Sequence, residues 1–143
     1  MTIAAILARK GSEIVSLPTG SRVRDAVAVL ALNRIGAIPI LDAAGQVAGI
    51  LSERDIVYCL ETKGAETLDS PVDTAMTAPA ITIGADVPVI SALSQMSAKR
   101  IRHLPVVEGG KLVGFVSIGD LVAHRIRHIE QEADAMRAYI QGS

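Results

Sequence analysis

Two short motifs in the chain combine a serine with an aspartate three positions later, Ser52-Glu-Arg-Asp55 and Ser117-Ile-Gly-Asp120. Such a motif at a helix start is typical of a capping box, which stabilises the helix and binds nothing. Capping boxes favour Glu or Gln at the last position, so we expect the shorter Asp side chain to point outward. An outward carboxylate suits the two adjacent hydroxyls of a ribose, and serine beside free helix N–H groups suits a phosphate. The motifs therefore fit either capping alone or nucleotide binding.

A second pair of segments, Ile35-Gly-Ala-Ile-Pro39 and Ile101-Arg-His-Leu-Pro105, contains a proline within a predicted strand. Proline cannot donate to a β-ladder, so each strand is predicted to lie at a sheet edge or to be interrupted there. The backbone N–H and C=O groups that the ladder leaves unpaired near the proline can bind the edge of a heterocycle, and isoleucine side chains can pack against its face. Arg102 and His103 would then face phosphate, or else they mark a solvated strand end.

These motifs belong to an internal repeat. Pro39 and Pro105 are 66 residues apart, and Asp55 and Asp120 are 65 apart, which indicates one deletion in a turn. The residues between the identities keep their chemical character, so a tandem duplication is indicated. Two copies with one sheet face and one helix face each are expected to pack about a pseudo-twofold axis and to form two equivalent clefts.

Each copy is predicted to have the order β-α-β-β-α, which gives an α+β fold. The first copy has strands at 14–17, 37–41 and 46–51 and a helix at 25–33; the second has strands at 80–83, 103–107 and 111–116 and a helix at 88–98. The predicted divisions are a first repeat at 1–62, a polar linker at 63–71, a second repeat at 72–128 and a C-terminal helix extension at 129–143.

Composition limits the function further. The 143 residues carry a net charge of −1 and 2% aromatic residues, which argues against a nucleic-acid-binding surface. The single cysteine, Cys59, excludes an internal disulfide and fits a small buried residue. The apolar runs are too short to cross a bilayer, and the N-terminus lacks the pattern of a secretory leader. We expect a soluble cytoplasmic protein with no membrane partner.

The C-terminal segment has apolar residues spaced alternately by four and three. These residues are Val122, Ile126, Ile129, Ala133, Met136 and Ile140. This heptad stripe predicts a helix that packs on a partner subunit or back on its own domain, and we favour a homodimer. His124, His128 and Glu132 share one helix face at a spacing that suits metal ligands, but a solvated face without metal is the preferred interpretation.

The duplicated pattern resembles the CBS-domain pair, or Bateman module, over about residues 3–128. The resemblance implies clefts that bind AMP, ADP, ATP, NAD(H) or S-adenosylmethionine, with Asp55 and Asp120 on the riboses and Arg102 and His103 near the phosphates. Ser21 precedes the first helix of copy one where the family uses Ser or Thr, whereas its counterpart is Val87. We therefore expect the Asp120 cleft to bind more tightly. The residues expected to bind ligand are Ser21, Ile35, Gly36, Ala37, Ile38, Ser52, Arg54, Asp55, Arg102, His103, Leu104, Pro105, Ser117, Gly119 and Asp120.

The resemblance implies a non-catalytic regulatory module that binds adenine nucleotide and transmits its ligand state, through its dimer, to an unidentified effector protein. The alternative is a structural dimerisation module with vestigial clefts. An enzyme is not expected, because the sequence shows no Walker loop, no metal triad and no nucleophile paired with a base. No catalytic cofactor is expected either.

Overall fold

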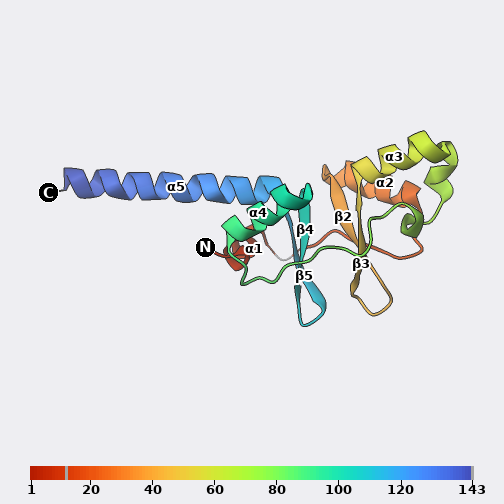
Figure 1. Ribbon diagram of the computed structural model, residues 1–143, viewed down its shortest axis with the longest axis horizontal. Helices are drawn as coiled ribbons and strands as arrows, with labels where there is room; N and C mark the ends of the chain where they lie inside the picture. The colour runs from red at the N-terminus through yellow and green to blue at the C-terminus, as the bar shows by residue number, and fades with distance from the viewer. Residues whose placement is uncertain (12, 143) are drawn as a thin grey trace.

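The computed structural model describes residues 1–11 and 13–142, and Figure 1 shows two similar α/β units side by side. The first unit contains α2 (Val23–Asn33), β2 (Ala37–Leu41), β3 (Val47–Ser52) and α3 (Glu53–Lys63). The second contains α4 (Val89–Lys99), β4 (His103–Glu108), β5 (Lys111–Ser117) and α5 (Ile118–Gln141). The remaining elements are α1 (Ile3–Lys10), β1 (Leu17–Pro18) and two 3-10 helices, η1 (Ala65–Asp69) and η2 (Val72–Thr74). The predicted α+β repeats are confirmed.

Each unit has its own apolar core of aliphatic side chains. Around the first sheet the fully buried side chains include Ile38, Ile40 and Leu51, and around the second they include Leu104 and Val116. The two hairpins use the same register, since Pro39 pairs with Ile50 and Pro105 with Phe115. The duplication in the sequence therefore appears as a duplicated packing arrangement.

The two units exchange their leading segments. Ile3 and Ile6 of α1 pack in the core of the second unit, although α1 opens the range predicted as the first repeat. Val72 and Ala75 pack in the core of the first unit in the same way. The backbone contacts are equivalent too, because the Val72 N–H donates to Ser21 O at 2.7 Å and the Ile3 N–H donates to Val87 O at 2.9 Å. The chain therefore crosses between the two units at α1 and at η2, and these two crossings hold the units together.

Two predicted strands differ from the structure, and two short elements have no predicted counterpart. The expected strand at 14–17 is only the two-residue β1, and the expected strand at 80–83 is a single bridge between Ile83 and Val106. Helix α1 was not predicted, and the range 63–71 holds η1, where Thr67 is buried and its hydroxyl donates to Cys59 O at 3.0 Å. These segments are short, so tertiary contacts decide their conformation more than local periodicity does.

The two prolines lie in different settings: β4, with Pro105, is an edge strand of a two-stranded sheet as predicted, whereas β2, with Pro39, is not at an edge. Strand β2 is the central strand of its sheet, in the order β1-β2-β3. Pro39 is nevertheless accommodated, because β1 pairs only with Ile40 and Leu41 and no donor is needed from residue 39 on that side. In β4 the Pro105 carbonyl accepts a bond from the Ile83 N–H at 3.0 Å.

The two units differ most after their leading segments. Helix α1 consists of good helix formers and continues to Lys10, where Gly11 ends it at a positive φ of 96°. Behind η2, Pro79 disfavours helix at the residue before it, and the chain leaves in extended form. Thr77 then bonds Ile50 through both backbone groups, at 2.9 and 3.0 Å. An extended strand-like segment therefore borders β3, whereas a helix end borders β5.

Gly49 permits this close approach, and its replacement gives a first testable prediction. A Cβ at Gly49 would lie 2.8 Å from the backbone oxygen of Thr77, whereas one at the equivalent Gly114 meets only the side chain of Leu7. We expect Gly49→Ala to lower the free energy of unfolding by about 1–3 kcal/mol in urea denaturation. Gly114→Ala is the matched control with a smaller loss, since Leu7 can rotate away; equal losses would contradict the prediction.

Candidate functional site

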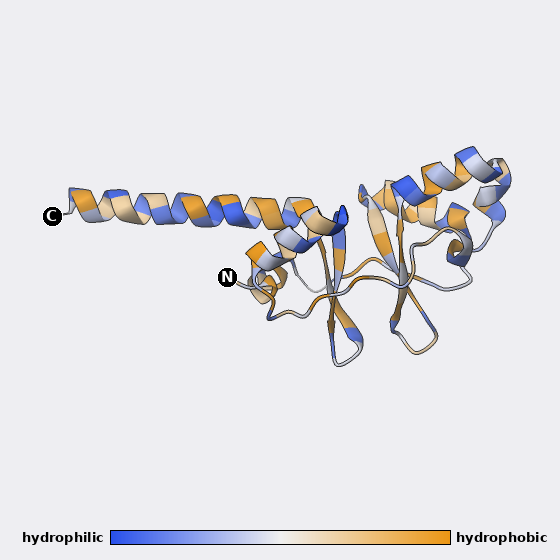
Figure 2. Ribbon diagram, in the orientation of Figure 1, coloured by the Kyte–Doolittle hydropathy of each residue, from blue (hydrophilic) through white to orange (hydrophobic). Residues whose placement is uncertain are grey.

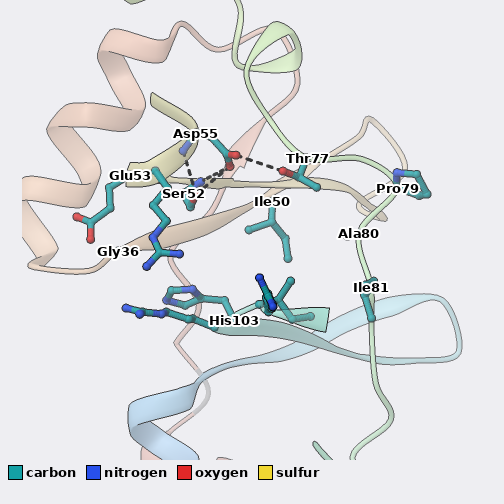
Figure 3. Close-up of a pocket in the computed structure, with 14 residues that line it drawn as sticks. Gly36, Ile50, Ser52, Glu53, Asp55, Thr77, Pro79, Ala80, Ile81 and His103 are labelled. Carbon is teal, nitrogen blue, oxygen red and sulfur yellow. Dashed lines mark hydrogen bonds between the residues drawn. The ribbon is translucent and has the colours of Figure 1, made fainter. Parts of the chain in front are cut away.

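A cavity of about 350 Å³ opens between the two units, beside the start of α3. Figure 3 shows Asp55 and Thr77 on one side of it and His103 across from them. The lining residues come from both copies of the repeat and from the extended segment between them. They are Gly36, Ile50, Ser52, Glu53, Arg54, Asp55, Thr77, Pro79, Ala80, Ile81, Arg100, Ile101, Arg102 and His103. The volume suits part or all of a small nucleotide.

Asp55 combines capping with an oxygen on the cavity side. Its Oδ2 accepts from the Ser52 N–H at 2.9 Å, and the Asp55 N–H donates to Ser52 Oγ at 3.2 Å. The capping interpretation is thus confirmed, since the Asp55 side chain closes the box through Oδ2 and does not simply point outward. The other oxygen, Oδ1, accepts from the Thr77 hydroxyl at 3.2 Å (Figure 3). One carboxylate oxygen therefore holds the helix while the second is engaged only by a hydroxyl that can rotate.

The cavity has apolar walls on two sides. Ile50 of β3 and Ile81 of the extended segment line it together with Ile101, and Figure 3 shows Ile50 pointing inward. Pro79 and Ala80 continue the wall made by the extended segment. Aliphatic side chains on opposite sides of a slot can enclose the faces of a flat heterocycle, which is how many ligand sites bury an aromatic ring.

The charged residues around the cavity have an excess of cations. Arg54, Arg100 and Arg102 line it, against Glu53 and Asp55. Guanidinium groups bind phosphate in a bidentate manner, so this lining provides donors for an anionic group. The site thus has a carboxylate for hydroxyls, an aliphatic slot and three cationic side chains.

His103 lies between the two clefts. Its ring stacks on Phe115, with centroids 5.6 Å apart and planes at 11°. Burial lowers the pKa of His103 below its ordinary value, the charge of Lys10 lowers it further, and Asp120 and Glu53 act in the opposite direction. The imidazole is therefore neutral at pH 7 in the absence of ligand.

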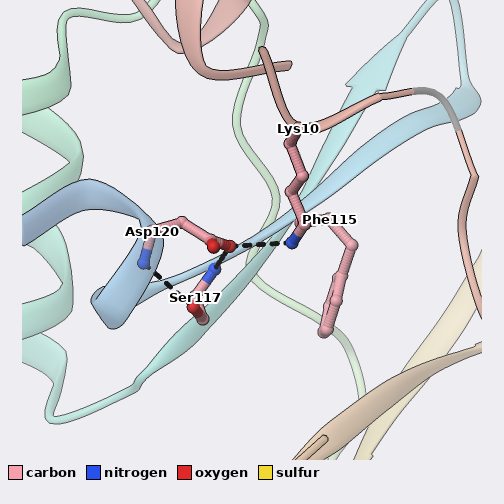
Figure 4. A network of polar contacts seen from close by, with 4 residues as sticks. All are labelled: Lys10, Phe115, Ser117 and Asp120. Atoms are coloured by element: carbon pink, nitrogen blue, oxygen red, sulfur yellow. Dashed lines mark hydrogen bonds and ion pairs between the residues drawn. The ribbon is translucent and has the colours of Figure 1, made fainter. Parts of the chain in front are cut away.

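The equivalent aspartate of the second copy is already engaged. The Lys10 ammonium contacts Asp120 Oδ2 at 2.7 Å and donates to Phe115 O at 2.7 Å (Figure 4). Partial burial raises the pKa of Asp120, but the hydrogen bonds from Lys10 and from the Ser117 N–H outweigh it and hold that pKa below its usual value. Ser117 and Asp120 also form a capping box. Lys10 thus binds Oδ2, the same oxygen that caps α5, and its ammonium lies beside the carboxylate that a second ligand would need.

Six of the predicted binding residues meet in the cavity: Gly36, Ser52, Arg54, Asp55, Arg102 and His103. The other nine lie outside its lining. Ala37, Ile38, Leu104 and Pro105 are buried in strands, Ile35 faces a separate groove between α2 and α3, and Ser21, Ser117, Gly119 and Asp120 lie at helix starts. The described cavity is built around Asp55, so the geometry favours that cleft, whereas the sequence favoured the cleft at Asp120.

Four of the eight lining residues outside the predicted set lie in the extended segment, namely Thr77, Pro79, Ala80 and Ile81. Pro79 carried a usable signal, since the residue before a proline is biased towards extended backbone. Ile50 faces the cavity from mid-strand, and nothing in its sequence position indicates this.

The cysteine and the histidines of α5 lie outside the cavity. Cys59 is buried in the first core, as predicted. His128 Nε2 lies 3.1 Å from Glu132 Oε1, and among residues 1–11 and 13–142 no group of three or more His, Cys, Asp or Glu side chains is placed to hold a metal ion. None of the helices described combines the length and apolar character needed to cross a membrane.

Comparison with known proteins assigns the family. The sequence profile of the CBS domain matches residues 7–62 and 72–127. A crystal structure of a CBS-domain containing protein from Agrobacterium tumefaciens is 35% identical, with a TM-score of 0.83, and the match covers 87% of this chain and 92% of that one. A CBS domain protein from Pyrobaculum aerophilum, complexed with AMP, is 30% identical over 84% of this chain and 89% of that one, with a TM-score of 0.75.

Among curated sequences, the mitochondrial CBS domain-containing protein CBSX3 of Arabidopsis thaliana is 33% identical over 87% of this chain. The chain spans 62% of the length of that relative and 24% of the length of two others from the same plant. The matching profile covers both repeats, and the fold agrees with solved pairs. The chain belongs to the CBS-domain family and carries two CBS domains in tandem.

Proposed function

We propose that this chain is a non-catalytic regulatory module that binds one adenine nucleotide in the cavity beside Asp55. The observation that carries the proposal is that one cavity brings together a carboxylate oxygen, an aliphatic slot and three arginines. These groups complement the ribose hydroxyls, the adenine ring and the phosphates of one molecule. The AMP complex of the Pyrobaculum relative supports this ligand class.

The proposed orientation follows from the position of each group. The ribose lies on Asp55, where its hydroxyls take the place of the Thr77 hydroxyl. The adenine enters between Ile50 and Ile81, and the phosphate extends towards Arg102 and His103. Because these residues come from both repeats, bound ligand links the two units. The ligand thereby favours one relative arrangement of the units, which a partner protein can recognise.

The direct test is calorimetric titration of the full chain with AMP, ATP and NADH at fixed salt and magnesium. We expect saturable binding at one site per chain by at least one of them, and the preferred compound identifies the signal. Failure of all three to bind would favour the alternative function, a dimerisation scaffold whose clefts are vestigial.

The position of His103 predicts a pH dependence. A phosphate beside the imidazole raises the pKa of His103, which is below its ordinary value without ligand, so binding takes up a proton. We expect AMP affinity to rise as pH falls from about 8 to 6.5, by at most about tenfold per pH unit, the limit for one proton. Adenosine, which lacks the phosphate, and the His103→Asn variant with AMP serve as controls. Equal pH dependence in all three would place the phosphate elsewhere.

A further inference from the structure

An apolar stripe on α5 lies outside the two cores. Figure 1 shows the C-terminal part of the helix extending away from both units, and Figure 2 shows hydrophobic residues recurring along its length. Val122, Ile126, Ile129 and Met136 are between 43% and 63% exposed. Of the two predicted interpretations, packing back on the chain's own domain is therefore excluded for this part of the helix.

The stripe continues onto the body of the second unit. Ile118, at the start of α5, is 38% exposed, and Ile90 of α4 is 58% exposed. Exposed apolar side chains that recur along a projecting helix mark an interface. The spacing of the stripe, with Val122, Ile129 and Met136 at heptad position d and Ile126 and Ala133 at a, is that of a two-helix seam.

The residues flanking the stripe discriminate between possible partners. With the stripe at a and d, Arg125 and Glu132 occupy g positions, and Glu130 and Arg137 occupy e positions. In a parallel helix pair, a g residue meets the e residue five positions later on the other helix. Arg125 then faces Glu130 and Glu132 faces Arg137, so all the charged flanking pairs are attractive, and symmetry provides each pair twice.

An antiparallel pair gives the opposite result. The alignment that overlaps the whole stripe places Met136 opposite Ile126. It brings each flanking glutamate close to its own counterpart, whereas Arg125 lies near Tyr139 and Arg137 near Ala123. Glu132 then meets Glu132 and Glu130 meets Glu130, which are two like-charge contacts. The sequence of charges is thus complementary to a second copy of α5 in the parallel direction.

We propose that two copies of this chain dimerise through α5 as a parallel helix pair, with Arg125 on Glu130 of the partner subunit and Glu132 on Arg137 of the partner subunit. In the single chain, Glu132 contacts His128 and Arg137 contacts Asp134 at 2.9 Å. The Glu132, Arg137 and Asp134 side chains are more than two-thirds exposed, so these local contacts are weak and exchange readily for pairs across the seam. The parallel direction places both nucleotide cavities at the same end of the dimer.

Charge reversal tests the direction of pairing. In the full chain with Arg125→Glu and Arg137→Glu, a parallel seam acquires four repulsive contacts. We expect the dimer dissociation constant from analytical ultracentrifugation to rise about 100-fold. An antiparallel seam keeps its glutamate contacts in this variant and would dimerise as the wild type does. That result, or a wild-type protein that stays monomeric at tens of micromolar, would overturn the proposal.

Two controls separate the seam from general effects of charge. The double variant Lys63→Glu, Lys111→Glu changes the net charge equally. Its substitutions lie at the end of α3 and in the β4–β5 hairpin, away from the seam, so we expect wild-type dimerisation.

The second control reverses the other two flanking charges. The double variant Glu130→Arg, Glu132→Arg makes all four flanking residues of the seam cationic and should also be monomeric. Mixing it in equal amount with the Arg125→Glu, Arg137→Glu variant should restore a dimer. A mixture that stays monomeric would contradict the assigned pairs.

Cross-linking provides an independent measurement. In a Cys59→Ala background, Met136→Cys places two thiols in one layer of a parallel seam, and we expect a disulfide-linked dimer on mild oxidation. In the antiparallel alignment these thiols are ten residues apart along the helix, about 15 Å, and cannot bond. Ala138→Cys, on the outer face, is the matched control without a cross-link. Equal cross-linking of both variants, or of neither, would overturn the parallel seam.

Discussion

Asp55→Ala is expected to weaken AMP binding about 100-fold or more. The substitution removes the carboxylate that accepts from two ribose hydroxyls, and hydrogen bonds to a charged group are each worth about 1.5–3 kcal/mol. Calorimetric titration measures the change directly. Because the apolar slot and the arginines remain, weak residual binding is compatible with the account, whereas undiminished affinity is not.

Asp120→Ala is the matched control for this variant. Both aspartates close a capping box on an equivalent helix, so both substitutions lose a cap contribution of about 1 kcal/mol. Only Asp55 lines the cavity, so only its loss should affect AMP. Equal weakening by both variants would indicate that the effect comes from helix stability and not from the site.

Lys10→Ala is expected to change the stoichiometry from one AMP per chain to two. The ammonium of Lys10 now satisfies both Asp120 and the Phe115 carbonyl, so a ligand at that cleft must displace it. Without Lys10, no ammonium lies beside the Asp120 carboxylate, and its Oδ2 keeps only the cap contact with the Ser117 N–H. The second site should appear as a distinct, weaker step in the calorimetric titration.

Arg9→Ala is the control for this prediction, because Arg9 is the preceding cation on α1 and is exposed. It removes the same charge but leaves the contact between Lys10 and Asp120 in place. We expect one site in the Arg9 variant. One site in both variants would show that Lys10 does not close the second cleft.

The sequence predicted the repeat, and with it most of the fold. Duplicated spacing gave β2 at its observed bounds and α2 and α4 to within two residues, because long periodic segments keep their local preferences. It could not predict the exchange of α1 and η2 between the cores. That exchange depends on contacts between Ile3 and Val87 and between Val72 and Ser21, which are remote in sequence.

The site was only partly predictable for the same reason. Asp55 and Asp120 each follow a serine by three positions, and Ser21 favoured the Asp120 cleft in the sequence. The structure distinguishes them through Lys10, which reaches Asp120 across 110 positions of the chain, and through Thr77, which reaches Asp55 from the extended segment. A helix that ends at Gly11 and a proline at position 79 set this difference, since they fix which segment borders each cleft.

A crystal structure of the full chain grown with AMP would show the proposed site itself. We expect one AMP per chain, with both ribose hydroxyls on Asp55, adenine between Ile50 and Ile81, and Lys10 still on Asp120. AMP bound at Asp120 with the Asp55 cavity empty would contradict this expectation.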